Sequence, residues 1–470
     1  MIYFYVQKNG VDFNLTNEEK IYMFEKMPIG SAVAKLAIPS VIGCLVMILY
    51  NLADTVFVGK LGNPVQNAAV TIVAPIILAF NAVNNLFGVG GSSLMSRALG
   101  NKDYDTVRKS SSFSFYGAII CAVLLSLISS LFKKKLLFLL GATDETYSAA
   151  CMYMFWTVSL GAVPSILNVV LGNLVRAEGS VLHATIGTMS GCILNIFLDP
   201  IFILPEMLDM GAAGAGLATF ISNTAACLYF FVLLSIKKKN TFVCISPKYF
   251  NLKKRIVTGV CGVGIPASIQ NLLNVTGMSI LNNFMSKYGS DPVAAIGIAH
   301  KVTMVPMYVS MGIAQGVMPL VGFNYAAGNR KRVKSSIKYT MVIGSIFMIL
   351  ATVVLYLFSE NIVSMIIDNK NVAYYGGAFM KGLSLAQPFL AMDFLAVGIF
   401  QACGMGGKSF IFSLLRKIVL EIPAIIILEK IYPMYGMAYS QLIAEFVLAI
   451  AALYFIVKII KAIPEKEDIN

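Results

Sequence analysis

Long apolar runs separated by short polar or basic segments dominate the chain. A helix needs about 20 mostly apolar residues to cross a bilayer, and twelve runs have that length. They cover residues 34–58, 67–91, 110–132, 147–174, 181–204, 211–235, 256–285, 293–323, 336–358, 372–402, 409–428 and 435–460. Lipid offers no partners to free backbone groups, and the runs lack the short alternation of barrel strands. The pattern therefore predicts an all-α integral membrane protein with twelve transmembrane helices.

Composition supports a membrane protein and excludes several other classes. Of the 470 residues, 58% are hydrophobic and 13% are charged, whereas a soluble domain is about 45–50% apolar and about 25% charged. The net charge of +13 would suggest nucleic-acid binding in a soluble protein. Here the basic residues lie mainly in loops, so topology explains them better. The eight cysteines are scattered, and we expect no metal, no disulfide framework and no cofactor.

Basic residues mark alternate loops between the runs, and such loops face the cytoplasm. They are Arg97, Lys102, Arg108, Lys109, Lys237, Lys238, Lys239, Lys248, Lys253, Lys254, Arg255, Arg330, Lys331, Arg332 and Lys334. Twelve spans then put both termini in the cytoplasm, and we expect a multi-pass protein of the inner (cytoplasmic) membrane. The predicted domains are an N-terminal tail (1–30), an N-lobe of six spans (31–236), a basic linker (237–255), a C-lobe of six spans (256–461) and a C-terminal tail (462–470).

The two halves resemble each other in sequence. "AIPSVIGCLVMILYNLADTVFVGKLGN" aligns with "GIPASIQNLLNVTGMSILNNFMSKYGS", which matches Pro39 with Pro266 and Gly62 with Gly289. Each half has six spans, an even number, so both enter the membrane from the same side. The halves are therefore expected to form two pseudo-symmetric six-helix bundles around a central cavity, a common transporter plan. An internal repeat also allows the protein to function as a monomer.

Two acids stand inside spans of the first half, where an ionisable group is costly and indicates function. At about 1.5 Å per residue, Asp54 is about 28 Å along span 1, and Asp199 is about 27 Å along span 5. Thr219 is about 12 Å into span 6 from the outer side, near the same level. Asn195 precedes Asp199 by one turn, and Tyr50 precedes Asp54 by one turn, so each pair shares a helix face. These five residues can therefore face one pocket.

Two carboxyl groups in one apolar pocket resist simultaneous ionisation. Such a site can hold a proton or a Na⁺ ion at Asp54 and Asp199 and release it when solvent access changes. A single acid near a helix end could instead reach interfacial water. The repeat argues against a packing role, because Asp54 aligns with Leu281 and Asp199 aligns near Ile422.

The second half has intramembrane charges of its own. They are Lys301, Lys381, Asp393, Glu421 and Glu445. Asp393 lies deep in span 10 and is predicted to contact an ion or the substrate. Gln270, Asn271 and Asn274 place amides on span 7, where they can line the substrate cavity or hold helices together.

Five stretches of the sequence carry a family resemblance. They are "EKMPIGSAVAKLAIPSVIGCLVMILYNLADTVFVGKLGN", "NLVRAEGS", "LNIFLDPIFI", "GAAGAGLATFISN" and "IFQACGMGGKS". In these stretches the chain resembles the multidrug and toxic compound extrusion (MATE) family, in particular its MepA-like bacterial branch. The first is similar to the family's opening, the next three to its spans 4 to 6, and the last to its span 10. The resemblance covers about residues 25–460. It implies two six-helix bundles around a central cavity and efflux of cationic, amphipathic compounds in exchange for inward H⁺ or Na⁺.

The resemblance also implies an N-lobe cation site. This site falls on Tyr50, Asp54, Asn173, Asn195, Asp199 and Thr219. The chain departs from the family at span 7, where some members have an acid and this chain has Asn274. A C-lobe ion site is therefore not implied.

Together, these features predict a secondary antiporter that exports drugs or metabolites by alternating access and is not an enzyme. Its expected partners are small drug-like cations, H⁺ or Na⁺, and membrane lipids, with no nucleic acid. One alternative is a lipid-linked oligosaccharide flippase, which would line its cavity with cationic residues such as Lys301 and Lys381. An integral-membrane enzyme would need a polar catalytic cluster, and the sequence has no His/Asp or metal-spaced set. A channel fits buried titratable acids less well.

Overall fold

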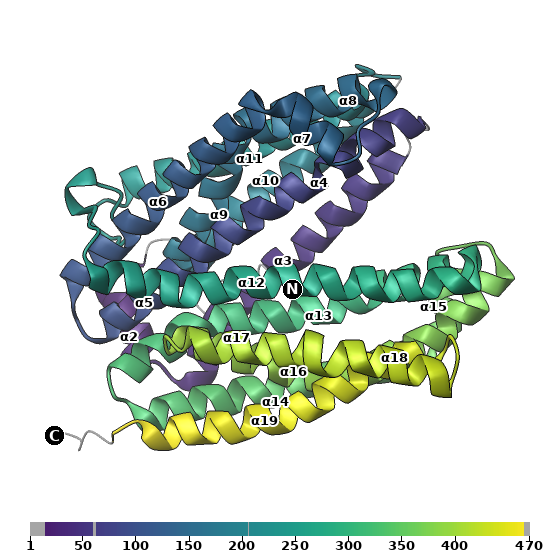
Figure 1. Ribbon diagram of the computed structural model, residues 1–470. Helices are drawn as coiled ribbons and strands as arrows, with labels where there is room; N and C mark the ends of the chain where they lie inside the picture. Colours follow the sequence, from purple (N-terminus) through teal and green to yellow (C-terminus); the bar gives the residue numbers. More distant parts are fainter. Residues whose placement is uncertain (1–14, 60–62, 205, 465–470) are drawn as a thin grey trace. The chain divides into compact units, whose positions relative to one another are not determined.

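The computed structural model describes residues 15–59, 63–204 and 206–464, and their regular structure is helical (Figure 1). The first half contains α2 (Asn17–Glu25), α3 (Ile29–Gly59), α4 (Pro64–Val83), η1 (Asn84–Val89), α5 (Gly90–Gly100), α6 (Tyr104–Leu131), α7 (Lys133–Leu139), α8 (Asp144–Met154), η2 (Phe155–Leu160), α9 (Ala162–Ala177), α10 (Val181–Ile203) and α11 (Gly211–Ile236). The second half contains η3 (Pro247–Tyr249), α12 (Lys254–Met285), η4 (Ser286–Tyr288), α13 (Ser290–Ala326), α14 (Arg330–Leu357), α15 (Ser359–Ser364), α16 (Lys370–Ala402), α17 (Gly406–Leu414), η5 (Leu415–Glu421), α18 (Ile422–Ile431), η6 (Gly436–Tyr439) and α19 (Ser440–Ala462).

The all-helical, membrane-spanning prediction is confirmed. Within the described ranges, ten helices are long and apolar enough to cross a membrane, and a pair bent by 47° gives an eleventh. This pair consists of Asp144–Leu160 and Ala162–Ala177. The remaining predicted span, span 11 (residues 409–428), is helical across α17, η5 and α18. Its middle turn is π-helical and contains Arg416, Lys417 and Glu421, so it lacks one uninterrupted apolar helix.

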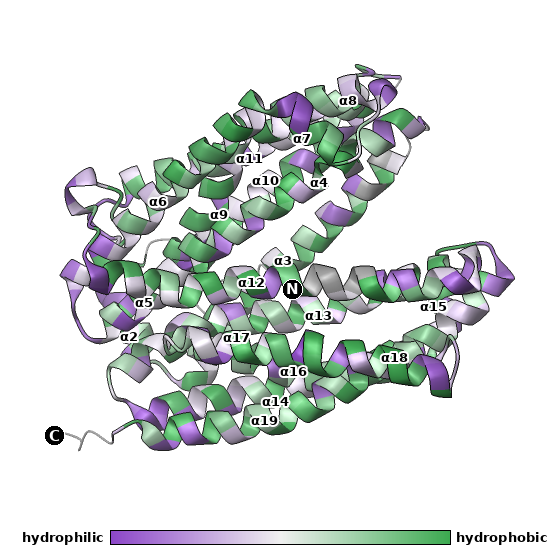
Figure 2. Ribbon diagram, viewed as in Figure 1, coloured by the Kyte–Doolittle hydropathy of each residue, from purple (hydrophilic) through white to green (hydrophobic). Residues whose placement is uncertain are grey.

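Apolar side chains cover the helices on their outer faces as well as inside. Figure 2 shows hydrophobic residues along the helices and hydrophilic residues gathered in the turns between them. Large exposed apolar side chains recur along α6, α14 and α19, including Ile120, Leu124, Leu127, Ile346, Leu350, Val354, Phe446, Ile450 and Val457. In water such faces would be unfavourable, whereas lipid solvates them. Burial therefore agrees with the hydropathy pattern.

The helices form two compact units. Unit 1 contains residues 1–27 and 42–268, and unit 2 contains residues 28–41 and 269–470. In unit 1, helices α9, α10 and α11 pack against one another. Their core includes Ile166, Val170, Leu171, Leu174 and Phe230. In unit 2, α16 packs against α13, α14 and α19, and the core includes Met285, Ile296, Phe379, Leu383 and Ile425.

Helix α3 is divided between the two units, and glycines explain where its first part packs. A Cβ atom at Gly316 of α13 would lie 2.5 Å from the carbonyl oxygen of Leu36. A Cβ atom at Gly312 would lie 2.8 Å from the Cα atom of Val41. Small residues allow helix backbones to approach this closely. The first part of α3 therefore belongs to unit 2, whereas its later part carries Tyr50 and Asp54 in unit 1.

Asp103 caps the N-terminus of α6. Its Oδ1 atom accepts a hydrogen bond from the Thr106 backbone N–H at 3.0 Å, and its Oδ2 atom accepts one from the Thr106 hydroxyl at 2.7 Å. The Arg255 side chain also lies 3.2 Å from Oδ2. The hydrogen bonds from Thr106, and then the charge of Arg255, lower the pKa of the Asp103 carboxyl. The ionised form of Asp103 therefore stabilises the folded protein.

We expect the Asp103→Ala substitution to destabilise the protein by about 1 kcal/mol at neutral pH, the usual cost of a lost N-cap. Because the folded pKa is lowered, the stabilisation is present above the ordinary pKa of about 4 and is lost as pH falls through the lowered pKa. Thermal midpoints of wild type and variant, measured in detergent at pH 7 and in acid, test this. The difference should shrink in acid, and an undiminished difference would contradict the assignment. Asp105→Ala, in the same turn, is the control.

Candidate functional site

Asp199 lies on α10 and is completely buried at 0% exposure. Asn195, one turn earlier on the same helix, is 2% exposed. In the orientation that satisfies its neighbours, the Asn195 amide nitrogen donates to Asp199 Oδ2 at 2.8 Å, and the amide oxygen accepts from the Thr219 backbone N–H at 3.2 Å. The structure thus joins three of the predicted residues through one amide that bridges α10 and α11.

Asp54 and Tyr50 approach this group from α3. The charge of Asp54 interacts with Asp199, and the Tyr50 phenol interacts with both acids. Asp54 is half-buried. Helices α3 and α10, which are distant in the sequence, therefore bring both carboxyl groups into one environment inside unit 1.

Tyr153 on α8 belongs to the same group, although the sequence did not single it out. Its phenol is 8% exposed and interacts electrostatically with Asp54 and Asp199. Tyr153 falls within a predicted span that also contains Tyr147, Phe155 and Trp156. No pattern in the sequence distinguishes Tyr153 from these other aromatic residues. Only the packing of α8 shows that it belongs to the group around Asp54 and Asp199.

Asn173, which the resemblance placed in the site, makes its hydrogen bonds within α9. Its amide nitrogen donates to the Val169 carbonyl at 3.1 Å, and its oxygen accepts from Arg176 at 3.0 Å. Asn168, five residues earlier, is 6% exposed and donates to the Asn223 amide oxygen on α11 at 3.3 Å. Asn223 lies one turn beyond Thr219, so Asn168 approaches the helix that carries part of the site. The available signal was the Asn168 amide inside the apolar run "VPSILNVVLG".

In unit 2, Asp393 on α16 is held by a buried ion pair. Arg416 on η5 donates to Asp393 Oδ2 at 2.8 Å, and both side chains are at most 3% exposed. The same guanidinium lies 3.9 Å from Glu445 on α19, and Lys417 pairs with Glu421 at 2.6 Å. The sequence analysis named Glu421 in this span and missed Arg416 and Lys417, although each is a single charge inside the same apolar run.

The amides predicted to line the substrate cavity lie on α12. The Gln270 oxygen accepts from Gln401 on α16 at 3.4 Å, which is a contact between helices within unit 2. Asn271 is half-buried. The side chain of Asn274 lies outside what the structure describes. In the part of the chain that the structure describes, no group of three or more His, Cys, Asp or Glu residues could hold a metal ion.

Comparisons with known proteins agree with this architecture. The MatE family model matches residues 39–201 and 266–427, so the two matches begin at the prolines that the internal repeat aligned. The Multidrug export protein MepA of Staphylococcus saprophyticus is 32% identical over 442 residues, with coverage of 93% of this chain and 96% of the relative. MepA of Staphylococcus aureus (strain NCTC 8325) is 31% identical over 441 residues, with coverage of 93% and 96%.

Solved structures show the same fold. One, described as the outward-facing conformation of a multidrug resistance MATE family transporter of the MOP superfamily, has a TM-score of 0.88 and 25% identity and covers 95% of this chain and 98% of that one. A MOP superfamily transporter from Pyrococcus furiosus has a TM-score of 0.85 and 25% identity, with coverage of 95% and 99%. The family model covers more than half of the chain, and the relatives match almost all of it. The chain is therefore a member of the MATE family of multidrug transporters.

Proposed function

We propose that this transporter is a secondary antiporter that exports cationic, amphipathic drugs or metabolites in exchange for inward H⁺ or Na⁺. The observation that supports coupling is the group of Asp54, Asp199, Asn195 and Thr219 in unit 1, in which Asp199 and Asn195 are buried. Asp199 is completely buried, and an ionisable side chain inside a membrane is retained chiefly for function. The relatives named as multidrug export proteins support the substrate class.

The group can exchange a charge with solvent in two ways. A proton on Asp199 Oδ1 leaves the hydrogen bond from Asn195 to Oδ2 in place. A Na⁺ ion between Asp199 and Asn195 requires the amide to turn, because its nitrogen faces the carboxyl group and cations bind oxygen. Either event neutralises a charge next to Asp54, and the Asp54 side chain belongs to α3. Cation binding thus favours a different conformation of α3, and alternating access follows from that change.

In this proposal the protein lies in the cytoplasmic membrane with both termini in the cytoplasm and functions as a monomer. The basic residues of the loops support the orientation. Unit 1 holds the coupling site, and cation discharge toward the cytoplasm resets the cycle. Cation binding can shift the equilibrium between the two conformations only if they bind the cation with different affinities.

Ethidium efflux from proteoliposomes under separately imposed pH and Na⁺ gradients tests this function. We expect efflux to follow one gradient and not the other, which would also identify the coupling ion. A pre-imposed membrane potential without either gradient serves as the control. Efflux that is absent under both gradients would contradict the antiporter, and lipid-linked oligosaccharides would then be tested as substrates of a flippase.

A further inference from the structure

The segment expected to be an N-terminal tail contains a helix that is buried against unit 1. Helix α2 begins with a capping box, in which Thr16 and Glu19 each accept a hydrogen bond from the other's backbone N–H at 2.7–3.3 Å. Lys20, Met23 and Phe24 on this helix are at most 2% exposed. A buried lysine needs a compensating charge, so α2 must have a specific binding partner.

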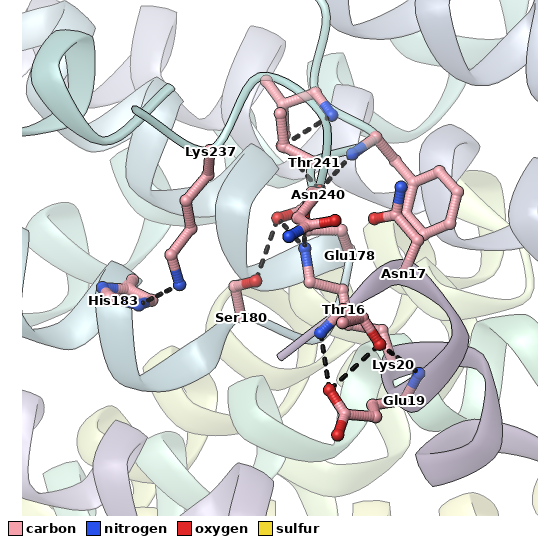
Figure 3. A network of polar contacts seen from close by, with 12 residues as sticks. Thr16, Asn17, Glu19, Lys20, Glu178, Ser180, His183, Lys237, Asn240 and Thr241 are labelled. Atoms are coloured by element: carbon pink, nitrogen blue, oxygen red, sulfur yellow. Dashed lines mark hydrogen bonds and ion pairs between the residues drawn. The ribbon is translucent and has the colours of Figure 1, made fainter. Parts of the chain in front are cut away.

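That partner is Glu178, at the C-terminal end of α9. Lys20 Nζ donates to Glu178 Oε1 at 2.7 Å and to the Asn240 carbonyl at 2.7 Å (Figure 3). The two side chains are 1% and 3% exposed. Lys20 therefore connects α2 to the end of α9 through the ion pair, and to the linker that follows α11 through the hydrogen bond to Asn240.

Glu178 is fully occupied by donors from three segments. Oε1 also accepts from the Ser180 hydroxyl at 2.9 Å. Oε2 accepts from the Thr241 hydroxyl at 2.9 Å and from the Phe242 backbone N–H at 2.6 Å. A carboxylate with this many donors has one favourable position, so the N-terminal helix, the α9–α10 turn and the linker are held as one body.

Gly179, the next residue, shows that this docking is close-packed. Its φ angle is +92°, and a Cβ atom there would lie 2.8 Å from Met23 Cε and 3.0 Å from the Phe24 ring. A side chain at this position would strain the backbone and force the Met23 side chain to shift. The apolar face of α2 thus packs closely against a turn whose backbone conformation favours glycine.

The path of the chain gives this docking a consequence. Residues up to Met27 belong to unit 1, Pro28–Val41 belongs to unit 2, and the chain returns to unit 1 at Ile42. The segment Pro28–Val41 is therefore preceded by α2 and followed by the part of α3 that carries Asp54, and both of these belong to unit 1. Without the contacts of α2, the N-terminal end of this segment would lose its anchor.

We propose that Lys20 and Glu178 are positioning residues for transport, because they anchor α2 to the α9–α10 turn and to the linker and so restrict the conformations of the adjoining helix α3, which carries Asp54. This inference rests on the proposed function for its transport readout. It assigns α2 a role in coupling rather than in cation or substrate binding, since neither residue touches the cation group.

The test compares wild type with the Lys20→Met and Glu178→Gln double variant. The double variant removes both charges, so neither is left buried and uncompensated, and it is expected to fold. The single variant Lys20→Met is measured beside it. Glu25→Gln is the matched control, because Glu25 lies on the same helix in an exposed ion pair with Lys102 at 3.8 Å.

Hydrogen–deuterium exchange provides a readout that does not depend on transport. In the double variant we expect faster exchange in α2 and also throughout residues 28–59, whereas Glu25→Gln should match wild type. Faster exchange confined to α2 and to its contacts at 178–183 and 240–243 would show a purely local anchor and overturn the proposal.

Transport in proteoliposomes gives the second readout, normalised to folded protein. We expect ethidium efflux per molecule to fall about tenfold, within the range by which residues outside both sites change coupling, and the number of coupling ions moved per ethidium to change. A purely structural role would leave that ratio at the wild-type value, and such a result overturns the proposal. If wild type shows no gradient-driven efflux, the proposed function fails, and the exchange pattern alone decides the role of α2.

Discussion

Replacing Asp199 with asparagine is expected to abolish gradient-driven ethidium efflux while leaving the protein folded. Asparagine has nearly the same shape and can still receive the Asn195 hydrogen bond at its oxygen, so the packing of α10 against α11 should survive. It cannot gain or lose a proton, and it offers a cation no negative charge. If the variant binds the coupling ion equally weakly in both conformations, ion binding cannot shift the equilibrium between them. Efflux under the driving gradient should fall to the level of empty liposomes.

The control for this substitution is Asp209→Asn, ten residues further along. Asp209 is exposed and has a φ angle of +45°, a conformation that asparagine also adopts readily. The control should transport as wild type does. Asp54→Asn should resemble Asp199→Asn, because the two carboxyl groups share one environment. Wild-type efflux in well-expressed, folded Asp199→Asn would rule out the coupling role of this acid.

The Arg416→Met substitution is expected to produce the largest loss of stability, about 3–5 kcal/mol, which is the usual cost of removing one partner of a buried ion pair. Arg416 compensates Asp393 directly at 2.8 Å and lies 3.9 Å from Glu445. Methionine fills a similar volume but leaves two buried acids without their cation. The thermal midpoint of the purified protein in detergent and the yield of monodisperse protein both measure this loss.

Restoring charge balance should recover the stability of the Arg416 variant. The triple variant Arg416→Met, Asp393→Asn and Glu445→Gln has no ionised group at this place and should unfold near the wild-type temperature, because apolar or neutral replacements of buried ion pairs are often tolerated. Arg255→Ala is the control, since its ion pair with Asp103 is largely exposed and exposed pairs contribute about 0–1 kcal/mol. A single variant as stable as wild type would show that Arg416 is not needed to compensate these acids.

The positions of polar residues along their helices were predictable, whereas most of their partners were not. A constant rise per residue predicts one level for Asp54, Asp199 and Thr219, and a one-turn spacing places Asn195 beside Asp199. The structure joins Asn195 to Asp199 and Thr219, and the role of this group in cation coupling stays a prediction. The same reasoning could not find Tyr153, because its depth is shared by several aromatic neighbours. It predicted that Asp393 contacts an ion or the substrate, which stays a prediction, and it did not find the ion pair of Asp393 with Arg416.

Two features show why tertiary packing was needed. Lys20 and Glu178 are 158 residues apart, so no local periodicity relates them, and a lysine in a short polar helix usually indicates an exposed face. The division of α3 depends on Gly312 and Gly316 of a distant helix, which accept its backbone at close range. Both contacts arise only when separate helices pack together.

By itself, the sequence determined that this protein is a helical membrane transporter and where its long apolar helices lie. These properties are local, because bilayer thickness sets the length of each apolar run. The tertiary structure alone decided which helix faces meet, that Arg416 neutralises Asp393 and that Lys20 ties α2 to Glu178. Rotation about each helix axis is set by packing with neighbours, and a buried charge is stable only beside the partner that this packing supplies.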